Sequence, residues 1–348
     1  MGFIWFWLVA IMLVAYVVLD GFDLGVGILH LFLARNEQER QLMLRSIGPV
    51  WDGNEVWLLA GGGTLYFAFP LVYASAFSGF YLALMIVLWL LIMRGASIEL
   101  RMQINIGVWR SFFDGLFFFS SALLAIFYGA ALANVIRGVP LHEDGYFFLP
   151  LWTNWRIGSQ PGILDWYTVI GGVVALVALA VHGALYLAVK TGADLQERSR
   201  TLARRLWGLL LVLTTVSLPA SIVARADTLA NYRAYPIAFL VPFAVLLALL
   251  GMIQFCRKGA DHKAFACSCV YLTLMLVGAA LGLYPRLLPS TTGAQYDITI
   301  EKALSGPHTL HVGIVWWAFG MGLALIYFII VYHMFRGKVS LEGGGYGH

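Results

Sequence analysis

Nine long apolar segments alternate with short charged connections, and this alternation restricts the fold more than any other feature of the chain. Hydrophobic residues make up 61% of the sequence and charged residues 11%, whereas soluble proteins carry about 25% charged residues. Each segment reaches the roughly 17–25 residues that an apolar helix needs to cross a bilayer. The sequence therefore predicts an all-α membrane protein with nine transmembrane helices, at about 3–33, 47–69, 72–93, 111–136, 162–189, 206–224, 236–256, 264–285 and 308–335.

Lysine and arginine are unevenly divided between the two sets of connections. One set, together with the C-terminal tail, holds 16 of the 22 basic residues, and the other set holds 6. Positively charged connections are retained in the cytoplasm. We therefore expect the N-terminus outside and the C-terminus in the cytoplasm.

Four carboxylates lie inside the first two apolar segments. Asp20 and Asp23 belong to the first, and Asp52 and Glu55 to the second. A charge at bilayer depth costs at least a few kcal/mol, so acids there usually face a bundle interior or a water path. Residues three apart share one side of a helix. The two pairs therefore predict either a proton relay or a static polar contact that holds the helices together.

The depths of these acids differ. Asp23 lies about ten residues before the inner end of its segment, or roughly 15 Å, and Asp52 about six residues, or roughly 9 Å, into the next. Arg94 closes the third segment at the same face, and Glu99 follows it. Arg94 can pair with one of the acids and hold it ionised. Together these residues would form a series of graded depth that starts at the cytoplasm.

Glycines accompany the acids. Gly21 and Gly25 form a GxxxG step, which Gly27 extends, and 61–63 is a run of three glycines. Small residues let helix backbones approach closely. We expect a close helix contact beside the first acidic pair, and a second one or a local distortion at 61–63.

Trp57 lies five residues after Asp52, about 140° around the helix at 3.6 residues per turn. It should therefore face away from that acid, toward lipid or another subunit. From the residues alone, this predicts simple packing or lipid contact.

The histidines and cysteines do not form a recognisable metal or haem site. His182 is the one histidine clearly inside an apolar segment, and His30 is its one candidate partner. Haem in a helical bundle needs axial ligands at matching depth. We expect no haem ligand and no metal ligand from this chain, and no nucleic-acid partner. Secondary transporters also contain intramembrane acids and glycine-broken helices, so a transporter is an alternative class of protein for this chain. A purely structural scaffold is a third class.

Two stretches, 20–27 (DGFDLGVG) and 48–57 (GPVWDGNEVW), resemble subunit II of cytochrome bd-type quinol oxidases. The similarity continues through Phe69-Pro70 and 73–81, and Arg94 completes it. The family resemblance implies two four-helix bundles plus one extra helix, in a bacterial cytoplasmic (inner) membrane. We divide the chain accordingly into 1–136, 137–285 and 286–348.

The resemblance also implies partners and cofactors. A homologous subunit I would carry the b haems, haem d or its b-type replacement, and the quinol site. The complex would oxidise quinol and reduce oxygen to water with cytoplasmic protons. A structural quinone in this subunit and small accessory subunits occur in some members, and lipid surrounds the complex. The implied proton-path residues are Asp20, Asp23, Asp52, Glu55 (a glutamine in some members), Arg94 and Glu99, and Trp57 would border an oxygen route.

Overall fold

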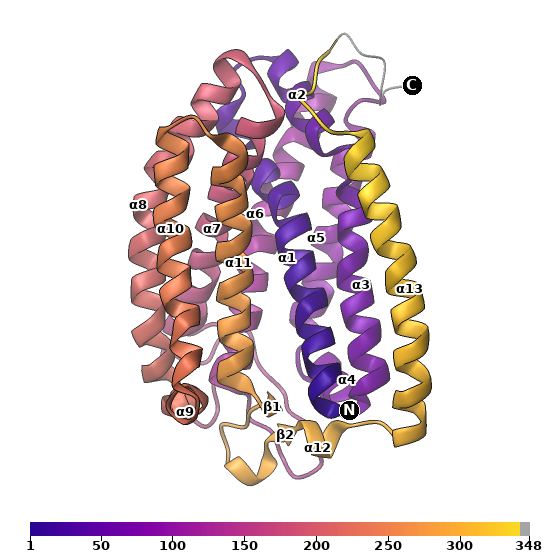
Figure 1. Cartoon of the computed structure of the whole chain (residues 1–348), viewed down its shortest axis with the longest axis vertical. Coiled ribbons are helices and arrows are strands. Elements are labelled where there is room, and N and C mark those ends of the chain that lie inside the picture. Colours follow the sequence, from indigo (N-terminus) through magenta and orange to yellow (C-terminus); the bar gives the residue numbers. More distant parts are fainter. Residues whose placement is uncertain (342–348) are drawn as a thin grey trace.

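The structure is a computed structural model that describes residues 1–341. Long helices run along the long axis of the molecule (Figure 1). The helices are α1 (Gly2–Leu33), α2 (Glu37–Ile47), α3 (Trp51–Ala68), α4 (Pro70–Gly79), α5 (Tyr81–Leu100), α6 (Gly107–Arg137), α7 (Trp166–Lys190), α8 (Ala193–Ala224), α9 (Ala230–Ala234), α10 (Leu240–Arg257), α11 (Asp261–Leu283), α12 (Ile300–Ala303) and α13 (Pro307–Met334). The short 3-10 helices are η1 (Ala226–Leu229), η2 (Pro236–Phe239) and η3 (Ala294–Tyr296), and β1 (Arg286–Leu288) pairs with β2 (Ile298–Thr299) in an antiparallel sheet.

Among the described residues, eight helices are long and apolar enough to cross a membrane, which confirms an all-α membrane protein. The second predicted segment corresponds to α3, which has 18 residues. It is not among the eight, because Asp52, Asn54, Glu55 and its glycines make it too polar by composition. Length and composition alone thus support eight spans rather than nine, although α3 runs beside α13 along the bundle (Figure 1).

The third predicted segment, 72–93, is divided in the structure. The chain bends at Phe69 and again at Phe80, so that α4 is a short helix and the apolar span is α5. Pro70 occupies the first turn of α4, where its fixed φ and missing N–H are tolerated. The boundaries predicted for this segment are therefore wrong, because the helix that starts at Pro70 ends at Gly79 and a second helix starts at Tyr81.

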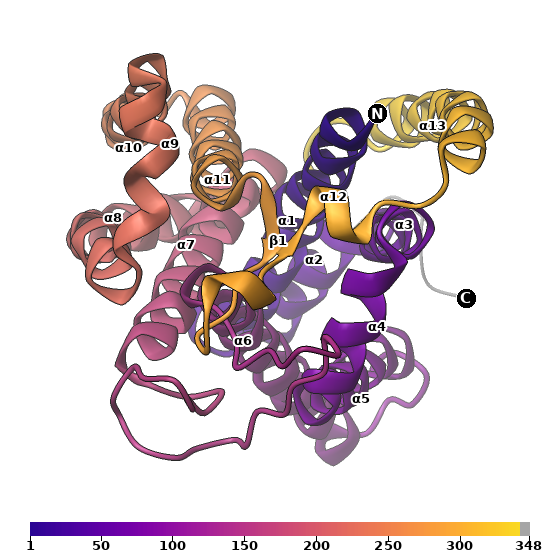
Figure 2. The ribbon, with the colours of Figure 1, turned by 90° about the horizontal axis from the view of Figure 1, so that it is seen from below.

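At the centre of the molecule, α1 contacts α3, α6 and α7 (Figure 2). It approaches α7 most closely where two glycines meet. A Cβ on Gly25 would collide with the carbonyl oxygen of Leu179 and lie 2.7 Å from the Cα of Gly183. This confirms the close contact predicted from the GxxxG step. In the run 61–63, a Cβ on Gly62 or Gly63 would meet nothing within 4 Å.

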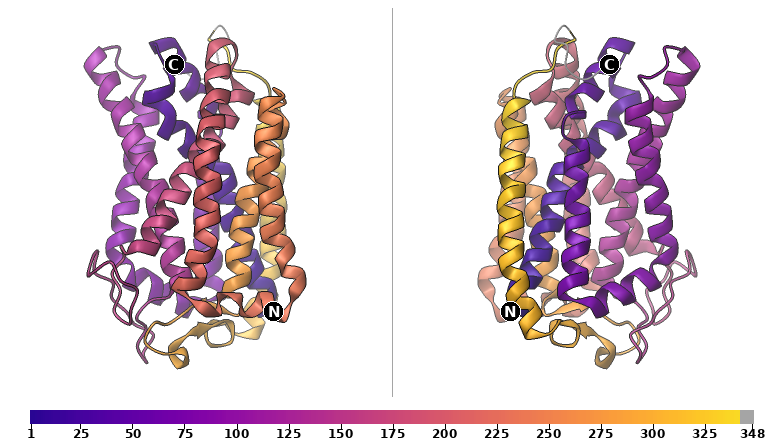
Figure 3. Two further views of the ribbon diagram at one scale, coloured as in Figure 1. Left: turned by 90° about the vertical axis from the view of Figure 1, so that its left-hand side faces the viewer. Right: turned by 90° about the vertical axis from the view of Figure 1, so that its right-hand side faces the viewer.

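The two ends of the bundle differ. The N-terminus lies at one end, here called the N-terminal end, and the end of α13 lies at the other, here called the α2 end (Figures 1 and 3). After α13 the chain crosses the α2 end as a strap, residues 335–341. Lys190 donates to the carbonyl of Phe335 (2.6 Å), and the N–H of Val339 donates to the carbonyl of Lys190 (2.8 Å). The strap therefore ties α13 to the end of α7.

The N-terminal end contains a hollow of about 290 Å³ beside the β1–β2 hairpin. Arg286 pairs there with Asp227 (2.7 Å) and Asp297 (2.6 Å), and Arg225 pairs with Asp227 (2.5 Å). Partial burial would raise the pKa of Asp227, but the hydrogen bonds from Arg225 and the nearby Arg286 lower it overall. The charges around the hollow are thus largely neutralised by one another.

Of the two predicted domain boundaries, the first falls before the last residue of α6 and the second falls between α11 and β1. The first, at 136–137, lies at the end of α6, and the second, at 285–286, follows α11. Helices on both sides of the first boundary pack together, since α1 and α6 both contact α7. The three-part division stays a prediction, and residues 342–348 of the predicted tail lie outside the described residues.

Candidate functional site

One face of α1 carries a row of polar side chains. Tyr16, Asp20, Asp23 and His30 are spaced by four, three and seven residues, which keeps them on one side of a helix with about 3.6 residues per turn. Tyr16 is 3% exposed and the other three are 0% exposed. Both acids predicted in the first segment therefore lie inside the protein rather than toward lipid.

Asp20 forms a buried ion pair with Arg94 of α5. The Nη1 of Arg94 donates to Asp20 Oδ2 (2.7 Å), and its Nη2 donates to Asp20 Oδ1. Both side chains are 0% exposed. The expected pairing of Arg94 with one of the acids is thus confirmed. A two-pronged, charge-assisted contact of this kind fixes the two helices relative to each other.

Asp23 is the buried acid without a cationic partner. The Nδ2 of Asn54 donates to Asp23 Oδ2 (2.8 Å), and Oδ1 has no hydrogen-bond partner among residues 1–341. The hydroxyl of Tyr332 in turn donates to Asn54 Oδ1 (2.8 Å). Helices α1, α3 and α13 therefore meet through one short chain of hydrogen bonds.

The sequence prediction missed Asn54, which binds Asp23, and Tyr332, which binds Asn54. Asn54 lies between Asp52 and Glu55, and a buried amide in an apolar segment requires hydrogen bonds just as a carboxylate does. This polarity could have identified it. Tyr332 gave no such indication, because tyrosines are common near the ends of membrane-spanning helices.

Two residues of the predicted path are exposed. Asp52 was expected about six residues inside its helix, but α3 begins only at Trp51, so Asp52 lies in the first turn and is exposed. Pro49 explains the late start, because proline interrupts the preceding helical run. Glu99 lies in the last turn of α5 and is also exposed, whereas Glu55 is half-buried. The expected series of graded depth therefore begins at the surface of this chain.

Trp57 lies inside the chain, so the expectation that it faces lipid or another subunit is wrong. Its side chain is 7% exposed, and its ring lies 5.4 Å from that of Phe328 on α13. It also packs near Met12 and Tyr16. The buried face of α3 starts at Asn54, three residues before Trp57. Because residues three apart share a face, the face opposite Asp52 is the one that packs against α1 and α13.

A second polar cluster lies near the α2 end, and the sequence prediction did not include it. The Nε2 of His30 lies 2.5 Å from Asp114 Oδ1 on α6. Arg101 donates to both oxygens of Asp114, at 2.5 Å and 3.0 Å, and Arg40 donates to Oδ2 at 3.1 Å. Arg101 also binds both oxygens of Glu37, at 3.0 Å and 2.9 Å. The cluster thus joins α1, α2, α5 and α6.

Glu37 is the part of this cluster nearest to solvent, with a side chain that is 36% exposed. Partial burial would raise its pKa, but the hydrogen bonds from Arg101 lower the pKa overall. Asp114 could have been identified from the sequence, because it is an acid inside the predicted fourth segment.

His182 does not offer a free nitrogen to a haem iron. Its Nδ1 lies 2.7 Å from the hydroxyl of Ser268, and its Nε2 lies 2.9 Å from the carbonyl oxygen of Val18. The other buried histidine, His30, binds Asp114 through Nε2. The two buried histidines therefore do not fit a haem that is held by two histidine ligands.

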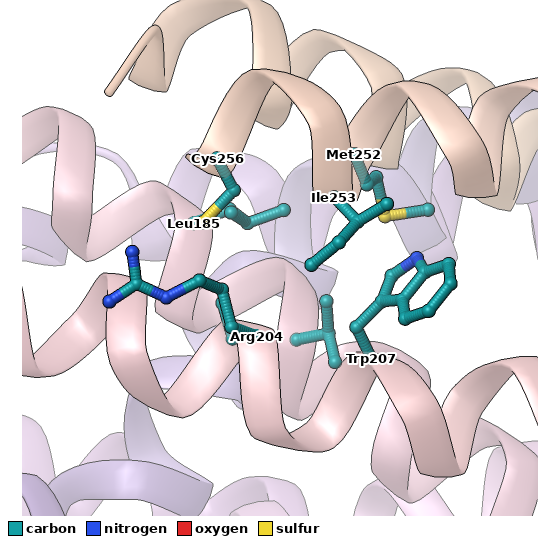
Figure 4. Close-up of a pocket in the computed structure, with 8 residues that line it drawn as sticks. Leu185, Arg204, Trp207, Met252, Ile253 and Cys256 are labelled. Atoms are coloured by element: carbon teal, nitrogen blue, oxygen red, sulfur yellow. The ribbon is translucent and has the colours of Figure 1, made fainter. Parts of the chain in front are cut away.

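A small hollow between α7, α8 and α10 is shown in Figure 4. Its volume of about 10 Å³ is roughly the minimum for one water molecule. A quinone ring does not fit there. The lining residues are Val181, Leu185, Ala203, Arg204, Trp207, Met252, Ile253 and Cys256.

Comparisons with known proteins agree with this architecture. The family described as "Cytochrome bd terminal oxidase subunit II" matches residues 1–335. The chain belongs to the cytochrome bd oxidase subunit II family. It is 33% identical over 368 residues to the cytochrome bd-I ubiquinol oxidase subunit 2 of Escherichia coli (strain K12), with 98% of this chain and 95% of that protein covered.

A second relative of this subunit II is the cytochrome bd ubiquinol oxidase subunit 2 of Bacillus subtilis (strain 168). It is 32% identical over 347 residues, which cover 97% of this chain and 96% of that protein. Among solved structures, a chain of the bd oxidase from Geobacillus thermodenitrificans has the same fold, with a TM-score of 0.76 at 15% identity over 96% of this chain and 98% of that chain. The chain is thus a multi-pass membrane subunit of a cytochrome bd oxidase complex, which implies a subunit I partner.

Proposed function

We propose that this chain is the non-haem-ligating subunit of a complex that oxidises quinol and reduces oxygen to water in a bacterial cytoplasmic (inner) membrane. The haems, b and d or a b-type replacement, belong to subunit I in this proposal. Family membership supports it, and so does the engagement of both ring nitrogens of His182. Quinol is the class of substrate named for its relatives.

The proposed topology has nine spans, with α3 as the ninth. The first four-helix bundle comprises α1, α3, α5 and α6, the second comprises α7, α8, α10 and α11, and α13 is the extra helix. The α2 end would face the cytoplasm, because most of the basic residues belong to the connections and strap at that end. The start of α1 and the end of α13 lie at opposite ends of the bundle, which agrees with an odd number of crossings.

Within this complex we propose that Asp23 passes cytoplasmic protons toward the haems of subunit I. One observation carries this proposal: Asp23 is fully buried, yet one of its oxygens accepts no hydrogen bond, whereas both oxygens of Asp20 are bound by Arg94. A proton carrier must be able to gain and lose a proton during turnover. Asp23 can do so without breaking an ion pair, whereas Asp20 cannot.

Glu55 and exposed Asp52 would then extend the path toward the surface. In this arrangement the ion pair of Asp20 and Arg94 holds α1 and α5 together as a static contact. The relay then belongs to Asp23, three residues further along α1.

The decisive experiment replaces Asp23 with asparagine in the assembled complex. Asp23→Asn keeps the shape and the contact with Asn54 but removes titration. We expect oxygen reduction to slow by about 100-fold or more, as for loss of a positioned acid–base group. Haem content and haem reduction by quinol should match wild type. Asp194→Asn, at an exposed position on α8, is the control, and unchanged turnover in Asp23→Asn would rule out the proton role.

We propose that Trp57 borders an apolar oxygen route between α1, α3 and α13, inside the chain rather than at a mouth open to lipid. Its packing against Phe328 and Met12 supports this position. Trp57→Ala should then change the oxygen on-rate more than Trp57→Phe does. Flash photolysis of the carbon monoxide complex in the presence of oxygen measures this rate, and wild-type rates in both variants would leave Trp57 a packing residue.

A further inference from the structure

Helices α1 and α6 run antiparallel and share a seam of polar side chains. At one end of the seam the hydroxyl of Tyr16 donates to that of Tyr128 (2.8 Å), and at the other His30 contacts Asp114. Between these contacts Ser121 packs directly on Gly27, where a Cβ would overlap its Oγ and lie 2.6 Å from its Cβ. The seam therefore extends from the cluster at the α2 end to the level of the buried acids.

Three buried atoms, two on α1 and one on α6, have no hydrogen-bond partner within residues 1–341. They are Asp23 Oδ1, Ser121 Oγ and His30 Nδ1, all in side chains that are 0% exposed. A buried polar atom without a partner costs about 1–3 kcal/mol, and ordered water is the usual partner when the protein offers none.

These three atoms also share a chemical property. The other unpartnered buried side-chain atoms of the described residues are N–H groups of tryptophan and arginine, apart from the hydroxyl of Thr153. Those N–H groups only donate hydrogen bonds. Carboxylate, hydroxyl and imidazole groups can each accept a proton or hydrogen bond and pass one on. The seam thus gathers the kinds of group that a proton pathway uses.

We infer that the α1–α6 seam is a proton input, in which His30 and Ser121 connect the cluster at the α2 end to Asp23 through bound water. This inference rests on the proposed role of Asp23. His30 and Asp23 are seven residues apart on α1, or about 10 Å along the helix. That separation is too long for one hydrogen bond, so Ser121 and water must fill it.

The proton balance along the seam is simple. Asp114 gives a proton to Nε2 of His30 while Nδ1 releases one to water, so the ring keeps its charge but changes tautomer, and rotation of the ring restores the starting tautomer. Ser121 accepts a hydrogen bond from one water and donates to the next. The last step forms an O–H bond at Asp23 Oδ1, which converts the carboxylate to the acid. Arg101 keeps its own protons and holds the carboxylates of half-exposed Glu37 and buried Asp114 side by side. A proton from solvent therefore passes from Glu37 to Asp114 through water, and from Asp114 to Nε2 of His30.

The test compares two neighbouring serines of α6. Ser121→Ala removes the unpartnered hydroxyl, whereas Ser120→Ala removes a hydroxyl that is bonded to the carbonyls of Leu116 and Phe117 in its own helix. The purified complex with its haem-bearing partner is reconstituted in liposomes. Proton uptake is followed with a pH-sensitive dye during flash-started oxidation, together with haem spectra.

Ser121→Ala should slow proton uptake by about tenfold, which corresponds to roughly 1.4 kcal/mol in the barrier. Ser120→Ala should match wild type, and both should keep normal haem spectra. Equal uptake rates in the two serine variants would overturn the inference. If Ser121→Ala does not assemble, His30→Gln decides, because glutamine can still donate to Asp114 but does not titrate. Slow uptake in that variant supports the seam, and wild-type uptake rejects it.

Asp23→Asn separates this inference from the proposed function. Slow uptake in Asp23→Asn with normal uptake in Ser121→Ala would reject only the seam. Normal uptake in Asp23→Asn would reject the role of Asp23 itself.

Discussion

Asp20 accepts hydrogen bonds on both oxygens from one guanidinium, whereas Asp23 accepts one hydrogen bond from an amide. The two acids are three residues apart on α1, and both are fully buried. Their difference arises from the neighbouring helices, since α5 supplies Arg94 and α3 supplies Asn54. The same side chain is thus suited to holding the structure at one position and to carrying a proton at the other.

We predict opposite results for single and double substitutions at the Asp20–Arg94 pair. Asp20→Asn leaves a buried guanidinium without its counter-charge, which typically costs about 3–5 kcal/mol. Assembly yield and thermal stability of the complex should therefore fall. Adding Arg94→Gln removes the unpaired charge and should restore part of the loss. Thermal unfolding of the haem-loaded complex measures both, and a double variant no more stable than Asp20→Asn would contradict the pairing as the stabilising element.

At the scale of elements, the crossing of α1 and α7 depends on Gly25 and Gly183. Gly25→Ala would place a methyl group against the backbone of α7, so the helices must separate and lose close packing. We expect a lower melting temperature and a smaller yield of complex. Gly208→Ala on α8, where a Cβ would meet nothing within 4 Å, is the matched control. Equal stability of the two variants would show that α1 and α7 tolerate a wider spacing.

Long apolar helices could be predicted from the sequence because a bilayer requires about 20 apolar residues per crossing. The division of 72–93 at Phe80 was missed, because the segment contains no charged residue and no proline that would mark the break between α4 and α5. The acids of α1 were identified by polarity alone. Their partners were not, because which helix lies beside Asp20 or Asp23 depends on tertiary packing. The burial of Trp57 was missed for the same reason.

At the scale of the whole molecule, the proposed orientation can be tested by labelling from one side. In a background without Cys256, Cys267 and Cys269, the exposed positions Glu143 and Lys258 each receive a single cysteine. A membrane-impermeant maleimide on intact spheroplasts should label Glu143→Cys. It should label Lys258→Cys only after the membrane is opened. The reverse labelling pattern would show that the orientation in the membrane is the opposite of the one proposed.

The hydrogen bond from Tyr332 to Asn54 also has a consequence for biosynthesis. The two residues are 278 positions apart, which a ribosome making roughly 5–20 residues per second needs tens of seconds to cover. Asn54 is inserted early, while α13 follows every other described helix. In the nascent subunit the chain of hydrogen bonds at Asp23 therefore stays incomplete until α13 docks.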